Sequence, residues 1–195
     1  LEIGTGSGYQ AAVLAEMERL GFENVRLEPC AVPVWVRGET EELTVVAPEA
    51  ARGERLRILA LGGSVGTPPD GLEAEVVRVT SFDELRALGG AARGRIVFFD
   101  RPMDPREPDP FRAYGGAVDQ RSRGAIEAAK AGGVAAIVRS MTMQRDDAPH
   151  TGAMRYEDGV ERVPGAAVST LGAERLAALL AEGPVAAAPI APRAP

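Results

Sequence analysis

The sequence has 195 residues, of which 45% are hydrophobic and 26% are charged, a balance that is typical of a folded globular protein. No apolar run approaches the roughly 20 residues that a bilayer-spanning helix needs, which excludes such a helix. The net charge is −6 with acidic and basic residues interspersed, and this argues against nucleic-acid binding, because a phosphate footprint needs clustered cations. The chain begins with Leu1 rather than Met, so we expect a fragment or a processed form, and the lack of a leader leaves the compartment open.

The numbers of thiol and imidazole groups set the strongest limit on the chemistry. The sequence contains one cysteine, Cys30, and one histidine, His150. An internal disulfide and a four-thiolate zinc site are therefore excluded. A histidine-rich metal centre or a serine–histidine triad would have to use His150 alone.

The first part of the chain predicts one helix followed by short strands. Apolar residues follow helical spacing over 7–20, and Gly21 stands where a C-terminal cap is expected. The next stretch, 24–36, reads as extended, and its prolines favour an edge strand over a central one. Further β-rich runs separated by turn residues are "ELTVV" (42–46), "LRILAL" (56–61) and "AEVVRV" (74–79).

The second part predicts alternating strands and helices. Ser81 followed by Glu84 is typical of a capping box at the start of a short helix, and Thr170 is the expected cap of the last helix. The predicted helices are 81–88, 117–133 and 170–183; the predicted buried strands are 96–99, 134–140 and 165–170. We therefore expect a mixed α/β (α+β) domain over 24–183, after a glycine loop and helix over 1–23 and before an extended, mobile Ala/Pro-rich tail over 184–195.

The glycine loop is the first candidate binding site. "LEIGTGSGYQAAVLAE" resembles the S-adenosylmethionine-binding motif of protein-L-isoaspartate O-methyltransferases. The resemblance implies a cofactor site with Glu2, Gly4, Gly6 and Gly8 at the loop and Glu28 near the ribose hydroxyls. The alternative is that the glycines lead into an ordinary helix, because the following residues carry no further motif of that enzyme. A methyltransferase-like cofactor binder is thus the second functional hypothesis.

From about residue 15 to 183 the chain resembles a different family. The segments "VPVWVRGETEELTVVAPEA", "FDELRALGGAARGRIVFFDRPMDP", "QRSRGAIEAAKAGGVAAIVRSMT" and "DDAPHTGAMRYEDGVERVPGAAVST" are similar, in order, to bacterial zinc peptidases related to carboxypeptidase Q. More narrowly, they resemble the N-terminal helix and strand and the inserted protease-associated domain of those enzymes. This resemblance implies a protease-associated type of fold, with a β-rich part packed by short helices.

The same resemblance implies a role without catalysis. The family's two zinc ions are held by histidines and carboxylates in a catalytic domain that follows the insert, and the present chain lacks such a ligand set. We therefore expect no cofactor in this chain and no catalytic residue. The expected role is accessory: shaping access to a cleft or mediating subunit contacts, with a catalytic peptidase domain, a peptide substrate or a second copy as partner. The family also implies export, with which a single cysteine is compatible.

One polar loop, "QRDDAPHTGAMRYEDG", is the second candidate site. Its Asp146, Asp147 and His150 lie within five residues and could hold one divalent ion or a peptide amino terminus, with Tyr156 close behind. Alternatively, Asp147 and His150 brace a long surface loop, because no second histidine completes a zinc site. The family resemblance implies that the loop faces the catalytic cleft of a full-length relative.

Three further features predict structure rather than chemistry. The proline-rich loop after the strand 96–99 carries Asp100, Asp104 and Asp109, and we expect it to be solvated because it lacks the rhythm of a calcium loop. Trp35 is expected to anchor a core or an interface, and a third hypothesis pairs its edge strand with a partner or a second copy. Cys30 is expected to be a small buried residue.

Overall fold

The computed structural model describes residues 9–31, 34–38, 41–68 and 71–190. The chain divides into two compact units, Leu1–Val34 and Trp35–Pro195. The domain boundaries after residues 23 and 183 stay a prediction. The helices are α1 (Tyr9–Arg19), α2 (Phe82–Ala87), α3 (Pro110–Gly115), α4 (Val118–Lys130) and α5 (Thr170–Glu182), with short 3-10 turns at Glu49–Ala51 and Gly89–Ala92. The strands are β1 (Glu42–Ala47), β2 (Arg55–Leu56), β3 (Ile58–Ala60), β4 (Ala74–Val79), β5 (Ile96–Phe99), β6 (Ala135–Arg139), β7 (Gly165–Val168) and β8 (Ala186–Ile190).

The first unit consists of α1 and an irregular stretch. The predicted cap is confirmed: Gly21 takes a φ of 83°, and the Phe22 N–H reaches the Met17 carbonyl at 3.1 Å, which is the Schellman arrangement. The stretch predicted as an edge strand forms no strand over its described residues. Cys30 is exposed rather than buried, because the described residues of this unit include no buried side chain against which it could pack.

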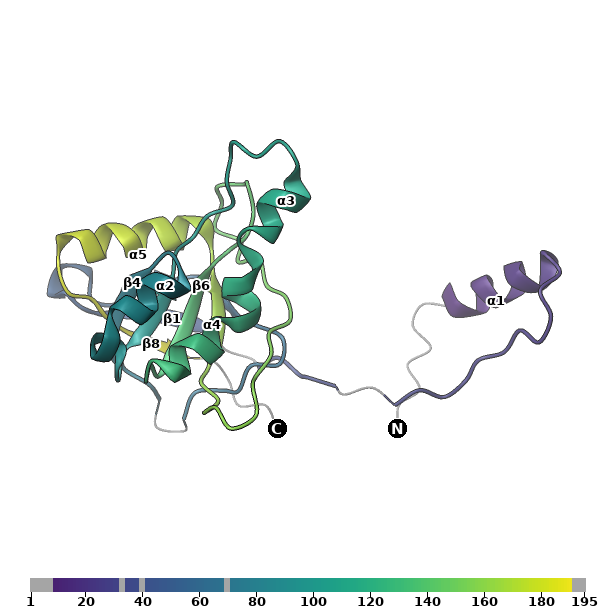
Figure 1. The fold of residues 1–195 in the computed structure, drawn as a ribbon, viewed down its shortest axis with the longest axis horizontal. Coiled ribbons are helices and arrows are strands. Elements are labelled where there is room, and N and C mark those ends of the chain that lie inside the picture. Colours follow the sequence, from purple (N-terminus) through teal and green to yellow (C-terminus); the bar gives the residue numbers. More distant parts are fainter. Residues whose placement is uncertain (1–8, 32–33, 39–40, 69–70, 191–195) are drawn as a thin grey trace. The chain divides into compact units, whose positions relative to one another are not determined.

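The second unit is built on one eight-stranded sheet with the strand order β2-β1-β8-β4-β5-β6-β7-β3 (Figure 1). Its centre, β4 to β7, is parallel, while β3 runs antiparallel to β7 and β8 runs antiparallel to both β4 and β1. Together with α1, this confirms the predicted mixed α/β class and the N-terminal helix. Among the described residues, no helix has both the length and the apolar character to cross a membrane.

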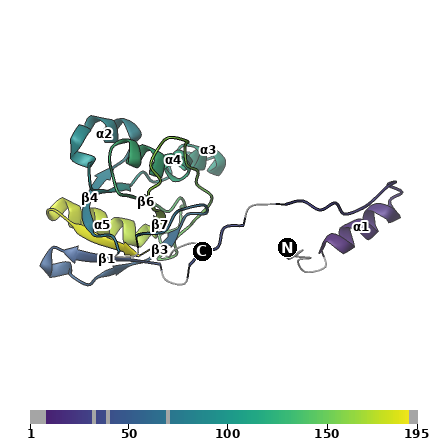
Figure 2. The ribbon, with the colours of Figure 1, turned by 90° about the horizontal axis from the view of Figure 1, so that it is seen from below.

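Helices cover both faces of the parallel strands (Figure 2). Side chains alternate along β5, so Ile96 and Phe98 pack on the α5 face with Leu176, while Val97 and Phe99 pack on the face of α2 and α4. All four β5 residues are at most 1% exposed. The continuous apolar run is therefore explained by burial on both faces.

The Ala/Pro-rich stretch after residue 183 contains a strand instead of the expected extended, mobile tail. Residues of β8 pair with β1 on one side and with Ala74 and Glu75 of β4 on the other. Val185 and Ala187 are fully buried. The alanine and proline side chains of this stretch show no hydrophobic periodicity, so the sequence does not predict a strand. Backbone pairing and close packing of small side chains form the strand without such a pattern.

The capping residues explain where the helices begin. Ser81 Oγ accepts a hydrogen bond from the Glu84 N–H, as predicted, although the Glu84 carboxylate binds Thr80 rather than the N-H of Ser81. The cap of α5 is Ser169, not Thr170, because its hydroxyl accepts the Gly172 N–H at 2.9 Å. Asp109 caps α3, a helix that starts inside the expected loop.

Both ends of the sheet are short strands, and the β3 edge is covered. The Ala60 N–H donates to Glu41 Oε1 at 3.1 Å, and the Ala60 carbonyl accepts from Arg37 at 3.1 Å. Trp35 lies in an irregular segment, and its indole N–H donates to the Ser64 carbonyl at 3.0 Å. Trp35 therefore anchors a loop, and the charged side chains of Arg37 and Glu41 occupy the backbone groups of Ala60, which a pairing strand would otherwise use.

Candidate functional site

Polar residues follow four neighbouring parallel strands at one edge of the sheet. Thr80, Asp100, Ser140 and Ser169 come directly after β4, β5, β6 and β7. Because the carboxyl ends of parallel strands meet at one edge, these residues are brought together although up to 89 positions separate them in the sequence. This edge is also where open α/β sheets most often bind ligands, and it is therefore the candidate site.

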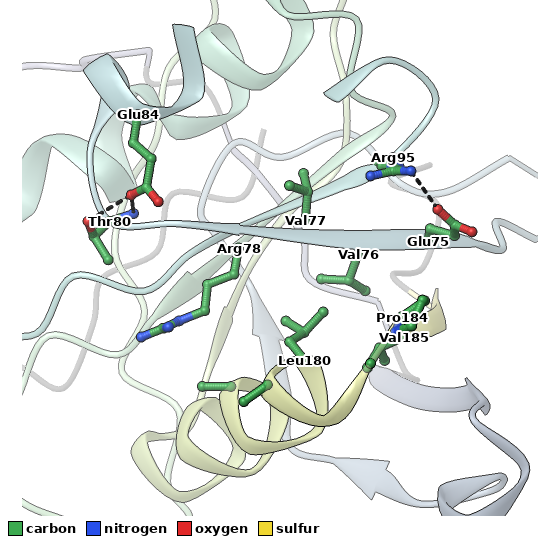
Figure 3. A pocket seen from close by; sticks show the side chains of 13 residues that line it. Glu75, Val76, Val77, Arg78, Thr80, Glu84, Arg95, Leu180, Pro184 and Val185 are labelled. Atoms are coloured by element: carbon green, nitrogen blue, oxygen red, sulfur yellow. Dashed lines mark hydrogen bonds and ion pairs between the residues drawn. The ribbon is translucent and has the colours of Figure 1, made fainter. Parts of the chain in front are cut away.

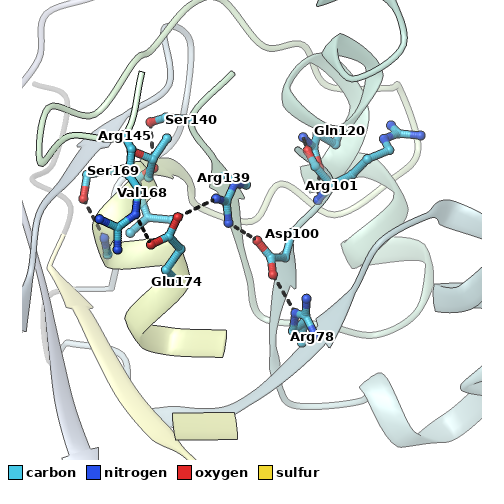
Figure 4. A network of polar contacts seen from close by, with 12 residues as sticks. Arg78, Asp100, Arg101, Gln120, Arg139, Ser140, Arg145, Val168, Ser169 and Glu174 are labelled. Atoms are coloured by element: carbon cyan, nitrogen blue, oxygen red, sulfur yellow. Dashed lines mark hydrogen bonds and ion pairs between the residues drawn. The ribbon is translucent and has the colours of Figure 1, made fainter. Parts of the chain in front are cut away.

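Asp100 is the centre of this edge. Its side chain is 3% exposed, and its two carboxylate oxygens accept hydrogen bonds from Arg78 at 2.6 Å and from Arg139 at 2.9 Å (Figure 4). The expectation of a solvated Asp100 is therefore wrong. The physical reason is that β5 ends inside the sheet, between two strands that each supply a guanidinium, and a buried carboxylate is tolerated only with such partners.

The ion pairs continue beyond Asp100 across the edge. Arg139 also contacts Glu174 of α5 at 3.5 Å, and Glu174 accepts a hydrogen bond from Arg145 at 2.7 Å. Figure 4 shows the resulting row of alternating charge. It joins β4, β5, β6, α5 and the loop after β6, so it fixes that loop on the sheet.

The two aspartates of the polar loop bind the start of α5. The Asp146 carbonyl accepts the Thr170 hydroxyl at 2.9 Å, and its carboxylate accepts the Ala148 N–H at 3.0 Å. Asp147 accepts the Ser169 hydroxyl at 2.7 Å and lies 3.8 Å from Arg57. Both residues thus brace the loop.

His150 and Tyr156 have different neighbours. The backbone N–H of His150 donates to Ser140 Oγ at 2.8 Å, and the residue is exposed. The Tyr156 hydroxyl donates to the Val163 carbonyl and accepts the Val65 N–H, both at 2.9 Å. Burial raises the pKa of this phenol. The structure therefore brings Asp146 and Asp147 together at α5, while Tyr156 joins two other segments; a cleft-facing role for the loop stays a prediction.

The described residues do not offer the donor set of a zinc site. Within the four described ranges, no three side chains of histidine, cysteine, aspartate or glutamate converge in the way that a metal ion requires. The carboxylates of Asp146 and Asp147 are already bound to N–H, O–H and guanidinium groups. A zinc ion therefore does not fit these residues.

The glycine-loop prediction lies mostly outside the described residues. Glu2, Gly4, Gly6 and Gly8 belong to residues 1–8, which the structure does not describe. Glu28 is described, exposed and paired with Arg26 at 2.5 Å. Its carboxylate is therefore already engaged with a neighbouring guanidinium.

A cavity of about 520 Å³ opens beside Arg78, between β4 and the C-terminal half of α5 (Figure 3). Val76 and Leu180 line its apolar part, and its charged groups are already paired: Glu75 with Arg95 at 2.9 Å, and Glu84 with the Thr80 N–H at 2.6 Å. The Thr80 hydroxyl donates to the same carboxylate, and these two hydrogen bonds lower the pKa of Glu84. No sequence signal predicts this cavity, because its two walls are about 100 residues apart.

Known proteins similar to this chain are peptidases. Carboxypeptidase Q from Bos taurus is 41% identical over 163 residues, and that from Homo sapiens is 40% identical over 167 residues. These alignments cover 84% and 86% of the chain but 32% and 33% of the relatives, so the chain spans about a third of their length. No family model matches the sequence.

Solved structures extend the likeness to the fold. A crystal structure of a peptidase M28 precursor from Shewanella amazonensis superposes with a TM-score of 0.80 at 35% identity, over 96% of this chain and 42% of that one. An aminopeptidase from Aneurinibacillus shares the fold alone, with a TM-score of 0.55 at 16% identity. Over more than four-fifths of its length the chain is therefore a peptidase-related sequence, homologous to about a third of carboxypeptidase Q.

Proposed function

We propose that this chain is the non-catalytic, protease-associated part of a zinc-dependent peptidase similar to carboxypeptidase Q. In this role it shapes access of peptide substrates to a neighbouring catalytic domain or mediates contacts between subunits. The zinc ions belong to that catalytic domain, where two metals polarise the peptide carbonyl and activate water.

One pair of observations carries the proposal. The similarity to carboxypeptidase Q covers most of this chain but a third of that enzyme, and the described residues of the chain hold no group of metal ligands. A region that is homologous to a metallopeptidase, and whose described residues offer no such ligand group, fits an accessory role. The relatives named above are peptidases, which gives the methyltransferase alternative no support.

Two exposed apolar side chains suit a contact with another domain. Phe111 is 86% exposed and Met143 is 50% exposed. Each is two residues from a member of a small buried cluster, Ala113 and Met141 respectively, so both stand on packed structure. Large apolar side chains displayed in this way are frequent at protein interfaces.

A direct assay tests the non-catalytic part. The purified chain, incubated with zinc and dipeptide or aminoacyl-anilide substrates, is expected to give no turnover above the blank. Zinc-dependent turnover that a chelator abolishes, and that survives removal of contaminating enzymes, would overturn the proposal.

A chimera tests the accessory part. The matched segment of the Shewanella peptidase is replaced by this chain, which shares 35% identity with it, and the product is compared with the parent and with a version lacking the segment. We expect the chimera to recover peptidase activity that the deletion has lost. A chimera no more active than the deletion, although folded and zinc-loaded, would contradict the accessory role.

A further inference from the structure

Arg121, at the start of α4, differs from the other arginines of the chain. Most described arginines lie within 4.0 Å of a carboxylate, for example Arg78 and Arg139. Among the described residues the arginines without such a partner are Arg93, Arg121, Arg155 and Arg162. Of these four, Arg121 is partly buried whereas the other three are exposed. It is thus a semi-buried cation to which the described structure offers no anion.

The surrounding residues hold this guanidinium in one place. Its Cζ lies 5.4 Å from the centre of the Tyr114 ring, a cation–π contact from α3. On Gly152 a Cβ atom would stand 2.6 Å from the same Cζ, so the backbone there packs directly against the guanidinium. The carbonyl of Gly152 accepts the Gly62 N–H at 2.9 Å, which fixes that backbone to the sheet.

One nitrogen of the Arg121 side chain is buried without a hydrogen bond. Its Nε atom is buried and has no hydrogen-bond partner. A buried donor without an acceptor is unfavourable, and the described structure leaves this guanidinium nitrogen without an internal partner. The residue as a whole is partly exposed, so a ligand can approach it from solvent.

We propose that Arg121 is a binding residue for the carboxylate group of a peptide. A planar guanidinium binds a carboxylate through two parallel hydrogen bonds, and restraint by Tyr114 and Gly152 reduces the entropy lost on binding. A single carboxylate is favoured over a polyanion because the chain carries a net charge of −6. The proposal stands on the geometry of Arg121 and does not require the peptidase-related role.

Nuclear magnetic resonance of the Arg121 side chain tests the proposal. The ¹H–¹⁵N signal of its Nε–H is identified by its absence from the spectrum of R121K. N-acetylglycylglycine, with a free carboxylate, is titrated to about 20 mM, which covers a millimolar dissociation constant. We expect a saturable shift of this signal with the free acid and no shift with the corresponding C-terminal amide at matched ionic strength. Equal shifts with acid and amide, or no saturable shift with either, would overturn the proposal.

A second peptide distinguishes the source of the carboxylate. N-acetyl-aspartylglycinamide carries its carboxylate on a side chain and has no free C-terminus. Tighter binding of the free-acid peptide would indicate recognition of a chain end, and tighter binding of the aspartyl peptide would indicate an acidic side chain; both support carboxylate binding.

Three variants complete the test. G152A keeps the charge of Arg121 but places a Cβ against its Cζ, so we expect at least a fivefold weaker affinity for the free acid, whereas G90A, where a Cβ meets nothing within 4 Å, should bind like the wild type. A variant with E2Q, E39Q and D70N removes the side-chain carboxylates that lie outside the described residues, and amidation of the C-terminus of Pro195 removes the remaining one. A changed Arg121 signal in that variant without peptide would show that the chain already supplies the anion, and the proposal would fall. None of these results bears on the chimera, which tests the accessory role separately.

Discussion

Asp100 accepts hydrogen bonds from Arg78 of β4 and Arg139 of β6, one at each carboxylate oxygen, at 2.6 and 2.9 Å. Arg78 and Arg139 lie on β4 and β6, and Asp100 directly follows β5 between them, so the ion pairs cross the sheet at the edge where a ligand would approach. The carboxylate is almost fully buried, while Arg78 is close to half exposed. This arrangement positions the loop after β6 and one wall of the cavity beside β4.

Replacing Asp100 by asparagine is expected to destabilise the fold by about 3 kcal/mol, because removal of one partner of a buried ion pair leaves an uncompensated charge. Urea unfolding monitored by circular dichroism measures the change. The control is D104N, since Asp104 pairs with Arg106 at the exposed surface, and its effect should stay within about 0.5 kcal/mol. Similar midpoints for D100N and the wild type would contradict the structural role of the network.

Glu84 predicts a small pH dependence of stability. Hydrogen bonds from Thr80 hold the pKa of Glu84 below its ordinary value. The ionised carboxylate therefore stabilises the folded state fully above the unfolded pKa of about 4.3. This stabilisation is lost as the pH falls through the lower pKa of the folded state. E84Q should therefore lose about 0.5 kcal/mol at pH 7, a small amount because the group is exposed. The difference between wild type and E84Q should shrink toward pH 3. A difference that is constant from pH 7 to pH 3 would contradict this linkage.

Tyr156 predicts both a stability effect and a titration. Y156F leaves the Val65 N–H and the Val163 carbonyl without their shared partner, which should cost about 1–2 kcal/mol in thermal or urea unfolding. Burial raises the pKa of this phenol, so ultraviolet titration should show an ionisation above the ordinary tyrosine range, and Y156F should lack that step. Because the pKa of Tyr156 is raised in the folded state, the neutral phenol stabilises the fold fully below the pKa of the unfolded state. This stabilisation is lost as the pH rises through the pKa of the folded state. Loss of an early step in Y156F would contradict the buried position.

Gly133 predicts a steric effect with a matched control. A Cβ there would lie 2.9 Å from a Val97 methyl group and 3.1 Å from the Ala128 carbonyl oxygen. G133A should therefore destabilise the fold by about 1–3 kcal/mol through overpacking. At Gly90 a Cβ meets nothing within 4 Å, so G90A should be neutral or stabilising by up to about 1 kcal/mol. Equal unfolding midpoints for the two variants would show that the packing around Gly133 is looser than described.

Local sequence signals were sufficient where the physics is local. Ser81 and Glu84 predicted the start of α2, and the Schellman turn at Gly21 followed from its position after an apolar helical pattern. The run Ile96–Phe99 predicted a buried strand, since no polar residue interrupts it, and the structure buries that strand on both faces. The same kind of reasoning failed for β8, whose alanines carry no periodic signal, and for α3, which begins at the proline after Asp109.

The candidate site depended on adjacency that no local pattern contains. Asp100 follows its strand like any loop aspartate, and only the placement of β4 and β6 beside β5 supplies two guanidinium groups to it. Tyr156 was grouped with Asp146 by nearness in the sequence, yet its hydroxyl joins Val65 to Val163.

The sequence alone determined the class of fold, most of the helices and strands and the scarcity of metal-binding side chains, because these follow from residue type, short-range spacing and composition. The tertiary structure decided which charges meet at the strand ends, where the cavity lies and how Arg121 is held without an anion. Those features arise between residues far apart in the chain, and their energies depend on burial, which exists only once the sheet has formed.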